Sequence, residues 1–153
     1  MKFTIELKTT PSELKQFTEM VLSKILEINE AVLTEVGLEF VRNARTNAPY
    51  EDHTGNLRSS KYLILVHDGQ VIQENFEESA KGTDRITGIE TAREIANSIS
   101  SEYPKGWVLI VGAAMEYASF VEAKGFDVIS GSTLGAEKRL SSAFQTVLNQ
   151  IIS

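Results

Sequence analysis

Apolar residues recur every three or four positions over the first third of the chain, from Pro11 to Asn47. This spacing stacks side chains on one face of a helix. Thr10, Pro11 and Glu13 together form a start signal, with a capping residue, a proline at the first helical position and a carboxylate at the capping-box position. The pattern therefore predicts a long N-terminal helix. Its apolar face comprises Leu14, Phe17, Val21, Ile25, Ile28 and Val32.

Two features of this predicted helix are unusual. Leu22, Leu26 and Leu33 widen the apolar arc beyond the ~100° needed to pack on one sheet, so the helix either lies deep in its own core or also contacts another subunit. About 36 residues would span roughly 54 Å, whereas a compact domain of this size measures about 40 Å. The apolar phase changes after Gly37, where Glu39 falls on the stripe. We expect a kink or break near Gly37, or a helix end that projects beyond the domain.

Alternating apolar and polar residues predict the strands of an antiparallel sheet. Residues 2–7 alternate in this way, and Asp68-Gly69 separates two β-prone runs at 60–67 and 70–76. A two-residue hairpin turn requires positive φ, which glycine adopts without strain. The sequence therefore predicts a strand at the start of the chain and a hairpin in its middle.

Two further runs complete the predicted sheet. The segment 107–111 is continuously apolar, which predicts a strand that is central or covered on both faces. The sequence "FDVIS" at 126–130 predicts a last short strand. The fold class is thus α+β, with the long N-terminal helix and further helices packed on an antiparallel sheet of four or five strands.

Three shorter helices follow from the remaining patterns. Residues 77–87 carry no period and predict a loop, after which Thr87 and Glu90 resemble a capping box for a helix at about 88–101. A short helix is predicted before Gly125, a suitable C-terminal stop. A closing amphipathic helix is predicted from about Leu134. Its apolar stripe comprises Leu140, Phe144, Val147, Leu148 and Ile151.

Composition limits the classes of function. The 153 residues predict one domain spanning 1–153. The chain has no cysteine, which excludes disulfides and thiol catalysis. Its net charge of -6 argues against generic nucleic-acid binding, which depends on neutralising phosphates. Neither a membrane span nor a cofactor motif is indicated.

The polar stretch "NAPYEDHTGNLRSS" at 47–60 is the strongest candidate for chemistry. Glu51, Asp52 and His53 could contribute to a metal-dependent hydrolase, with His67 and Asp68 as further ligands. Adjacent residues of an extended chain point to opposite sides, however. The simpler interpretation is a corner in which Pro49 ends the helix, because the residue before proline avoids the α region.

Three arginines lie near this corner. Arg42 and Arg45 are three positions apart on one helix face, and Arg58 follows the loop. The pattern favours interaction of Arg42 and Arg45 with the carbonyl end of the long helix. The alternative is that all three arginines pair with carboxylates of an adjacent subunit.

Two sequence blocks share a pattern beyond their local structure. The first block has the form "AP…TG-x-LR-x-S" and contains Ala48, Pro49, Thr54, Gly55, Leu57, Arg58 and Ser60. The second has the form "YA-x-(Y/F)-V-E-x-G" and contains Tyr117, Ala118, Phe120, Val121, Glu122 and Gly125. Both blocks resemble those of the tail-component or head–tail joining (neck) proteins of long-tailed phages and prophages. Their order relative to the predicted helices and hairpin also agrees with this family. The chain departs from the family at 77–105, which reads as an insertion carrying the helix at 88–101.

The resemblance implies a non-enzymatic protein of virion assembly, made in the bacterial host cytoplasm and incorporated into the virion. Such proteins form homo-oligomeric rings, commonly hexameric, at the head–tail junction, and bind other connector or tail proteins. Six copies of a chain of charge -6 would carry -36, so an acidic lumen would let DNA pass without sequence-specific binding. The sheet and long helix would form the intersubunit contact, and Glu122 would pair with an arginine such as Arg58, either within the subunit or across the interface. A non-viral adaptor that binds proteins is a further alternative.

Overall fold

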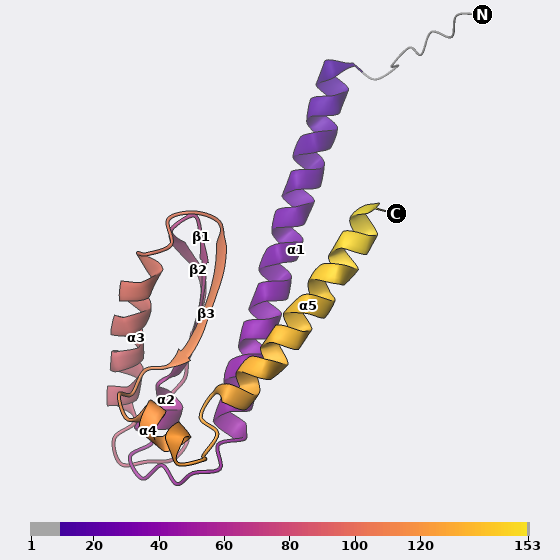
Figure 1. Cartoon of the computed structure of the whole chain (residues 1–153). Helices are drawn as coiled ribbons and strands as arrows, with labels where there is room; N and C mark the ends of the chain where they lie inside the picture. Colours follow the sequence, from indigo (N-terminus) through magenta and orange to yellow (C-terminus); the bar gives the residue numbers. More distant parts are fainter. Residues whose placement is uncertain (1–9, 153) are drawn as a thin grey trace, which may run out of the picture.

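The computed structural model describes residues 10–152 and has three layers (Figure 1). A three-stranded sheet lies between one helix on one face and two long helices on the other. The α+β class is therefore confirmed. The elements are α1 (Pro11–Thr46), α2 (Asn56–Ser59), β1 (Lys61–His67), β2 (Gln70–Phe76), α3 (Ile86–Ser100), β3 (Trp107–Ala113), α4 (Ala118–Ala123) and α5 (Ser130–Ile152).

The long helix α1 is continuous and begins where the sequence predicts. The Thr10 hydroxyl accepts a hydrogen bond from the Glu13 amide at 3.2 Å, and the Glu13 carboxylate accepts one from the Thr10 amide at 2.8 Å. No break occurs at Gly37. A Cβ atom there would lie 2.7 Å from Leu63 and 2.9 Å from Leu109, so glycine lets the helix approach the sheet closely.

The second alternative for α1, a projecting end, is the one that the structure adopts (Figure 1). The described buried residues of the helix begin at Leu33, and every residue from Pro11 to Met20 is exposed. Of the three leucines that widen the apolar arc, Leu33 is buried, whereas Leu22 and Leu26 are 54% and 44% exposed. The wide arc therefore divides between the core and an uncovered surface.

The central hairpin is confirmed. Strands β1 and β2 pair antiparallel, and the two turn residues, Asp68 and Gly69, have φ values of 48° and 78°. Strand β3 also pairs antiparallel with β1, giving the order β2-β1-β3. The central strand is thus β1, and β3 is an edge strand whose side chains are half-buried on both faces.

Two of the predicted strands do not appear in the described sheet, for different reasons. Residues 126–129 form an irregular connection and Ser130 begins α5, so the strand predicted at 126–130 is wrong. The strand predicted at 2–7 lies outside the described residues. The described part of the chain therefore has three strands instead of the four or five that the sequence suggested.

The sheet buries a different helix on each face because the side chains of β1 alternate. Tyr62, Ile64 and Val66 pack with the alanines of α3. Leu63 packs with Phe40 and Val41 of α1 on the opposite face. The segment 77–105, predicted from the sequence to be an insertion, thus supplies the helix that packs on one face of the sheet.

Two helix starts differ from the predictions. Helix α3 begins at Ile86, one residue before Thr87, so the predicted capping box at Thr87 and Glu90 is wrong. Instead the Asp84 carboxylate accepts hydrogen bonds from the Thr87 hydroxyl at 2.7 Å and the Thr87 amide at 3.4 Å. Helix α5 begins at Ser130, four residues before Leu134. Both errors arise because carboxylates from outside the helices act as caps.

Candidate functional site

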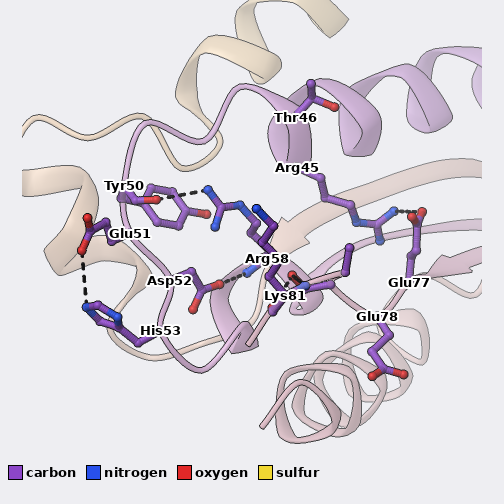
Figure 2. Close-up of a pocket in the computed structure, with 12 residues that line it drawn as sticks. Arg45, Thr46, Tyr50, Glu51, Asp52, His53, Arg58, Glu77, Glu78 and Lys81 are labelled. Carbon is purple, nitrogen blue, oxygen red and sulfur yellow. Dashed lines mark hydrogen bonds and ion pairs between the residues drawn. The ribbon is translucent and has the colours of Figure 1, made fainter. Parts of the chain in front are cut away.

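The corner, defined as residues 47–60, joins the end of α1 to the start of β1 and contains the short helix α2 (Figure 2). Helix α1 ends at Thr46, and the Asn47 amide donates to the Asn43 carbonyl at 2.9 Å. Pro49 lies three residues after Thr46, as expected from the restricted backbone before a proline. The corner is thus placed between the long helix and the central strand of the sheet.

Asp52 holds the corner together and is not free for chemistry. One carboxylate oxygen accepts from the Gly55 amide at 3.0 Å, and the other accepts from the Arg58 amide at 2.8 Å. The Thr54 hydroxyl lies 3.4 Å from the first of these oxygens. Asp52 therefore caps α2, a role that stabilises a helix start by satisfying its unpaired amides.

Position 55 requires glycine because of its backbone conformation and because of the close packing around it. Its φ is +81°, and a Cβ atom would lie 2.3 Å from the Lys81 carbonyl oxygen. The adjoining loop is hydrogen-bonded to the corner, with the Asp84 amide donating to the Thr54 carbonyl at 2.9 Å. The glycine of the first motif block thus permits close contact with the segment at 79–85.

Arg58 is committed to the backbone of the corner. Its guanidinium donates to the carbonyls of Ala48 and Tyr50, both at 3.1 Å, and lies 5.2 Å from the centre of the Tyr50 ring. Glu122, the expected partner of Arg58, instead accepts from the amides of Ser130 at 3.0 Å and Val128 at 3.4 Å. The predicted Glu122–Arg58 pair within the chain is therefore wrong.

Glu122 acts at the start of α5. Partial burial by itself would raise the pKa of its carboxyl group, but hydrogen bonds from Ser130 and from the backbone of 128–130 hold the pKa below its usual value of 4.5. A carboxylate at this place also interacts favourably with the positive end of the helix dipole. The glutamate of the second motif block is thus a helix cap.

The two motif blocks meet in one apolar cluster, although about 60 residues separate them. Tyr50, Leu57 and Val128 are buried together, and Ala118 and Val121 of the second block pack against them. Burial raises the pKa of Tyr117, and a side-chain hydrogen bond with Thr54 of the first block partly offsets this rise. The side chains of Tyr117 and Phe120 nevertheless remain 40% and 60% exposed.

Lys61, the first residue of β1, is fully buried and was not predicted from the sequence. Its ammonium donates to the Ala44 carbonyl of α1 and lies 5.2 Å from the Tyr50 ring centre. Burial, and after it the positive charge of Arg58, lowers the pKa of Lys61 to about 8. Burial likewise raises the pKa of Tyr50, whose hydroxyl is buried and lacks a hydrogen-bond partner among the described residues.

Arg45 links α1 to the hairpin. Its guanidinium donates to Asn75 at 2.7 Å, to the Lys61 carbonyl at 2.6 Å and to Glu77 at 2.9 Å. Arg45 lies in the last turn of α1, as the expected interaction with the helix end requires, but its hydrogen bonds go to other segments. The Ala44 carbonyl in that turn accepts its hydrogen bond from Lys61. Burial lowers the pKa of Arg45, which the nearby Glu77 carboxylate partly offsets.

An open depression of about 700 Å³ lies beside the corner, lined by both acidic and basic side chains. Figure 2 shows Glu51 and His53 at one end of it, away from Arg45 and Glu77. The His53 ring lies 3.5 Å from the Glu51 carboxylate, and both side chains are more than 80% exposed.

The other ligands of the hydrolase hypothesis lie elsewhere. His67 ends β1, and six residues of strand rise, roughly 20 Å, separate it from the corner. Its ring stacks on Trp107, with the ring centres 4.2 Å apart. Among residues 10–152 no group of three or more histidine, aspartate or glutamate side chains is arranged to hold a metal ion. The structure thus does not bring the five predicted ligands together.

Comparison of the chain with protein-family models, with curated proteins and with solved structures finds no match in any of the three. Within the described residues, the helices are too short or too polar to cross a bilayer.

Proposed function

We propose that the protein is a subunit of a tailed-phage or prophage virion, forming a ring at the head–tail junction or tail end. The observation that carries the proposal is the division of the second motif block between core and surface. Val121 and Ala118 pack against residues of the first block, whereas Tyr117 and Phe120 of the same short segment are 40% and 60% exposed. A rigidly held pair of exposed aromatic rings is typical of the centre of a protein interface.

Neighbouring residues enlarge this aromatic surface. Phe126, just beyond α4, is 42% exposed, and Leu134 at the start of α5 is 60% exposed. Tyr117, Phe120, Phe126 and Leu134 are called the α4 surface below. It is anchored by Glu122, whose hydrogen bonds fix α4 relative to α5. Little conformational entropy is therefore lost when a partner binds it.

A closed ring requires two different surfaces on each subunit, because each contact in it is heterologous. The fold offers a second surface at the free edge of β2, where Val71 and Ile72 are 42% and 39% exposed. Unpaired edge strands readily accept a neighbouring chain. In this proposal the α4 surface of one subunit contacts the β2 edge of the next.

The corner has a mechanical role in this proposal. The hydrogen bonds of Asp52, Arg58 and Lys61 fix the path from α1 to β1. The apolar cluster of the corner supports α4. No reactant is handled, and DNA passes through the ring without base-specific contact. The net charge of -6 per chain favours such passage because like charges repel.

The proposal is tested by deleting the gene from the phage or prophage that encodes it and examining the particles by electron microscopy. The expected result is DNA-filled heads separate from tails, with infectivity restored by the wild-type gene. Phe120→Asp should fail to restore it while the purified variant unfolds at the wild-type temperature. Ile86→Asp is the matched control, because Ile86 is 59% exposed on α3. Normal virions after deletion, or full restoration by Phe120→Asp, would contradict the proposal.

A further inference from the structure

The free half of α1, defined as residues 11–31, presents an apolar stripe that the described part of the chain leaves largely uncovered. Leu14 and Phe17 are each 59% exposed, and Val21, Ile25 and Ile28 continue the stripe half-buried. A groove of about 650 Å³ runs along this stripe, and its described lining comes from α1 alone. The stripe extends for four turns, which is much longer than an isolated exposed residue requires.

Helix α5 covers the same side of α1 further along the chain. Its Arg139 contacts Glu39, and Val32 and Thr146 lie together in the groove between the two helices. The two helices run antiparallel, and α5 diverges from α1 toward its C-terminal end (Figure 1). The free stripe therefore continues an existing helix–helix interface, and an antiparallel helix is the partner whose geometry fits it.

The spacing of the stripe indicates that this antiparallel helix is the same segment of a second copy of the chain. From Leu14 to Ile28 its members are separated by three, four, four and three positions, an order that is symmetric about Val21. When two copies lie antiparallel with Val21 at the two-fold axis, Phe17 of one faces Ile25 of the other. Leu14 likewise faces Ile28. Each apolar side chain thus meets another in an isologous contact.

The exposed apolar side chains of the free half supply a large part of the area that such a contact needs. Four large side chains lie on the stripe or flank it, and each presents roughly 100 Å² when about half exposed. Their sum is about half of the ~800 Å² that each partner contributes to a standard interface, and the half-buried Val21, Ile25 and Ile28 add to it. The four are Leu14, Phe17, Met20 and Leu22.

We propose that the protein forms a two-fold dimer in which the free halves of two α1 helices pack antiparallel about Val21. This contact goes beyond the proposed ring function and uses residues outside the α4 surface and the β2 edge. A dihedral assembly can contain both kinds of contact, one closing a ring and the other joining subunits across a two-fold axis.

The first test is sedimentation of the full chain over a range of concentrations. The wild type should associate as concentration rises, and its smallest associated species should have twice the 16.9 kDa chain mass. Val21→Lys should weaken association at least tenfold, because it places two charges together at the axis. Leu26→Lys is the matched control, since Leu26 is 44% exposed but lies roughly 140° around the helix from Val21. A wild type that remains monomeric throughout would overturn the proposal, as would a dimer that Val21→Lys leaves unchanged.

The second test examines the geometry of the dimer by disulfide cross-linking. The chain has no native cysteine, so an introduced cysteine is the only thiol. Val21→Cys should form an intermolecular disulfide on mild oxidation, whereas Leu26→Cys should not. Equal cross-linking of the two variants would show contact through another face and overturn the antiparallel arrangement. A species of six chains that persists in Val21→Lys would support the ring. If Phe120→Asp lost the six-chain species and kept the dimer, the ring contact and the two-fold contact would be shown to use different surfaces.

Discussion

The buried ammonium of Lys61 donates a hydrogen bond to the Ala44 carbonyl in the last turn of α1. Carbonyls in this turn lack the amide donors that the next turn would supply. The contact therefore satisfies the end of the long helix from the first residue of the central strand. It fixes the angle between α1 and the sheet, which in turn sets the direction in which the free half of α1 projects.

Lys61 should make stability depend on pH in the alkaline range. Its folded pKa is about 8 and its ordinary value is 10.5, so between these values the unfolded chain binds more protons than the folded one. The contribution of Lys61 to the free energy of unfolding therefore rises with pH over this range. Relative to Lys61→Met, the wild type should gain on the order of 2 kcal/mol between pH 8 and 10.5.

Urea unfolding of both proteins at several pH values measures this difference. The comparison cancels contributions from other groups, including Tyr50 and Tyr62, whose pKa values burial also raises. A difference between wild type and Lys61→Met that stays constant with pH would show that Lys61 titrates equally in both states.

Gly55 and Gly125 form a matched pair for backbone strain. Both have positive φ, +81° and +88°, but a Cβ atom at Gly55 would meet the Lys81 carbonyl, whereas at Gly125 it would meet open space. Gly125→Ala should cost about 1 kcal/mol from strain alone. Gly55→Ala should cost roughly 3 kcal/mol because steric overlap adds to the strain. Chemical denaturation of the two variants gives both values, and equal losses would refute the close contact at Gly55.

Gly37 and Gly135 provide a second pair, both inside helices. At Gly135 no atom would contact an added Cβ, so Gly135→Ala should stabilise the protein by about 0.5–1 kcal/mol. At Gly37 the same gain in helix propensity is opposed by overlap with Leu63 and Leu109. Gly37→Ala should therefore destabilise by about 1 kcal/mol. Thermal unfolding should shift in opposite directions, and a stabilised Gly37→Ala would show that α1 does not need its close approach to the sheet.

Glu122 should act through α5 and not through Arg58. Glu122→Ala should cost about 1 kcal/mol at neutral pH, the usual value of a lost cap. Because the folded pKa of Glu122 lies below its ordinary 4.5, this contribution is present above that pH and is lost as pH falls through the folded value. The curves of wild type and Glu122→Ala should therefore converge in acid.

Charge reversal checks the alternative pairing. Glu122→Lys should destabilise the protein, and adding Arg58→Glu should produce a further loss, since Arg58 supports the carbonyls of Ala48 and Tyr50. Recovery of stability in the double variant would instead establish a Glu122–Arg58 pair. The two single losses should add, because the side chains use different partners.

Several errors of the sequence-based interpretation share one cause. Local patterns predict the strand at 126–130 and the capping box at Thr87, but the carboxylates of Glu122 and Asp84 accept hydrogen bonds from the backbone there. The strand pattern at 60–67 does not distinguish Lys61, because a lysine is normally solvated. The Ala44 carbonyl at the end of α1 accepts a hydrogen bond from the ammonium, and this contact lowers the cost of burying Lys61.

What the sequence determined by itself is local: the capped start of α1, the Asp68-Gly69 hairpin, the glycine stop after α4 and the order of α1, the hairpin, α3, β3, α4 and α5. These features depend on residues within a few positions of one another, whose preferences act before any tertiary contact forms. The tertiary structure decided which strand is central, where Arg45, Arg58 and Glu122 bind, and how much of α1 is left uncovered. Such outcomes depend on which distant segments exclude water from one another, and residue spacing alone does not specify those partners.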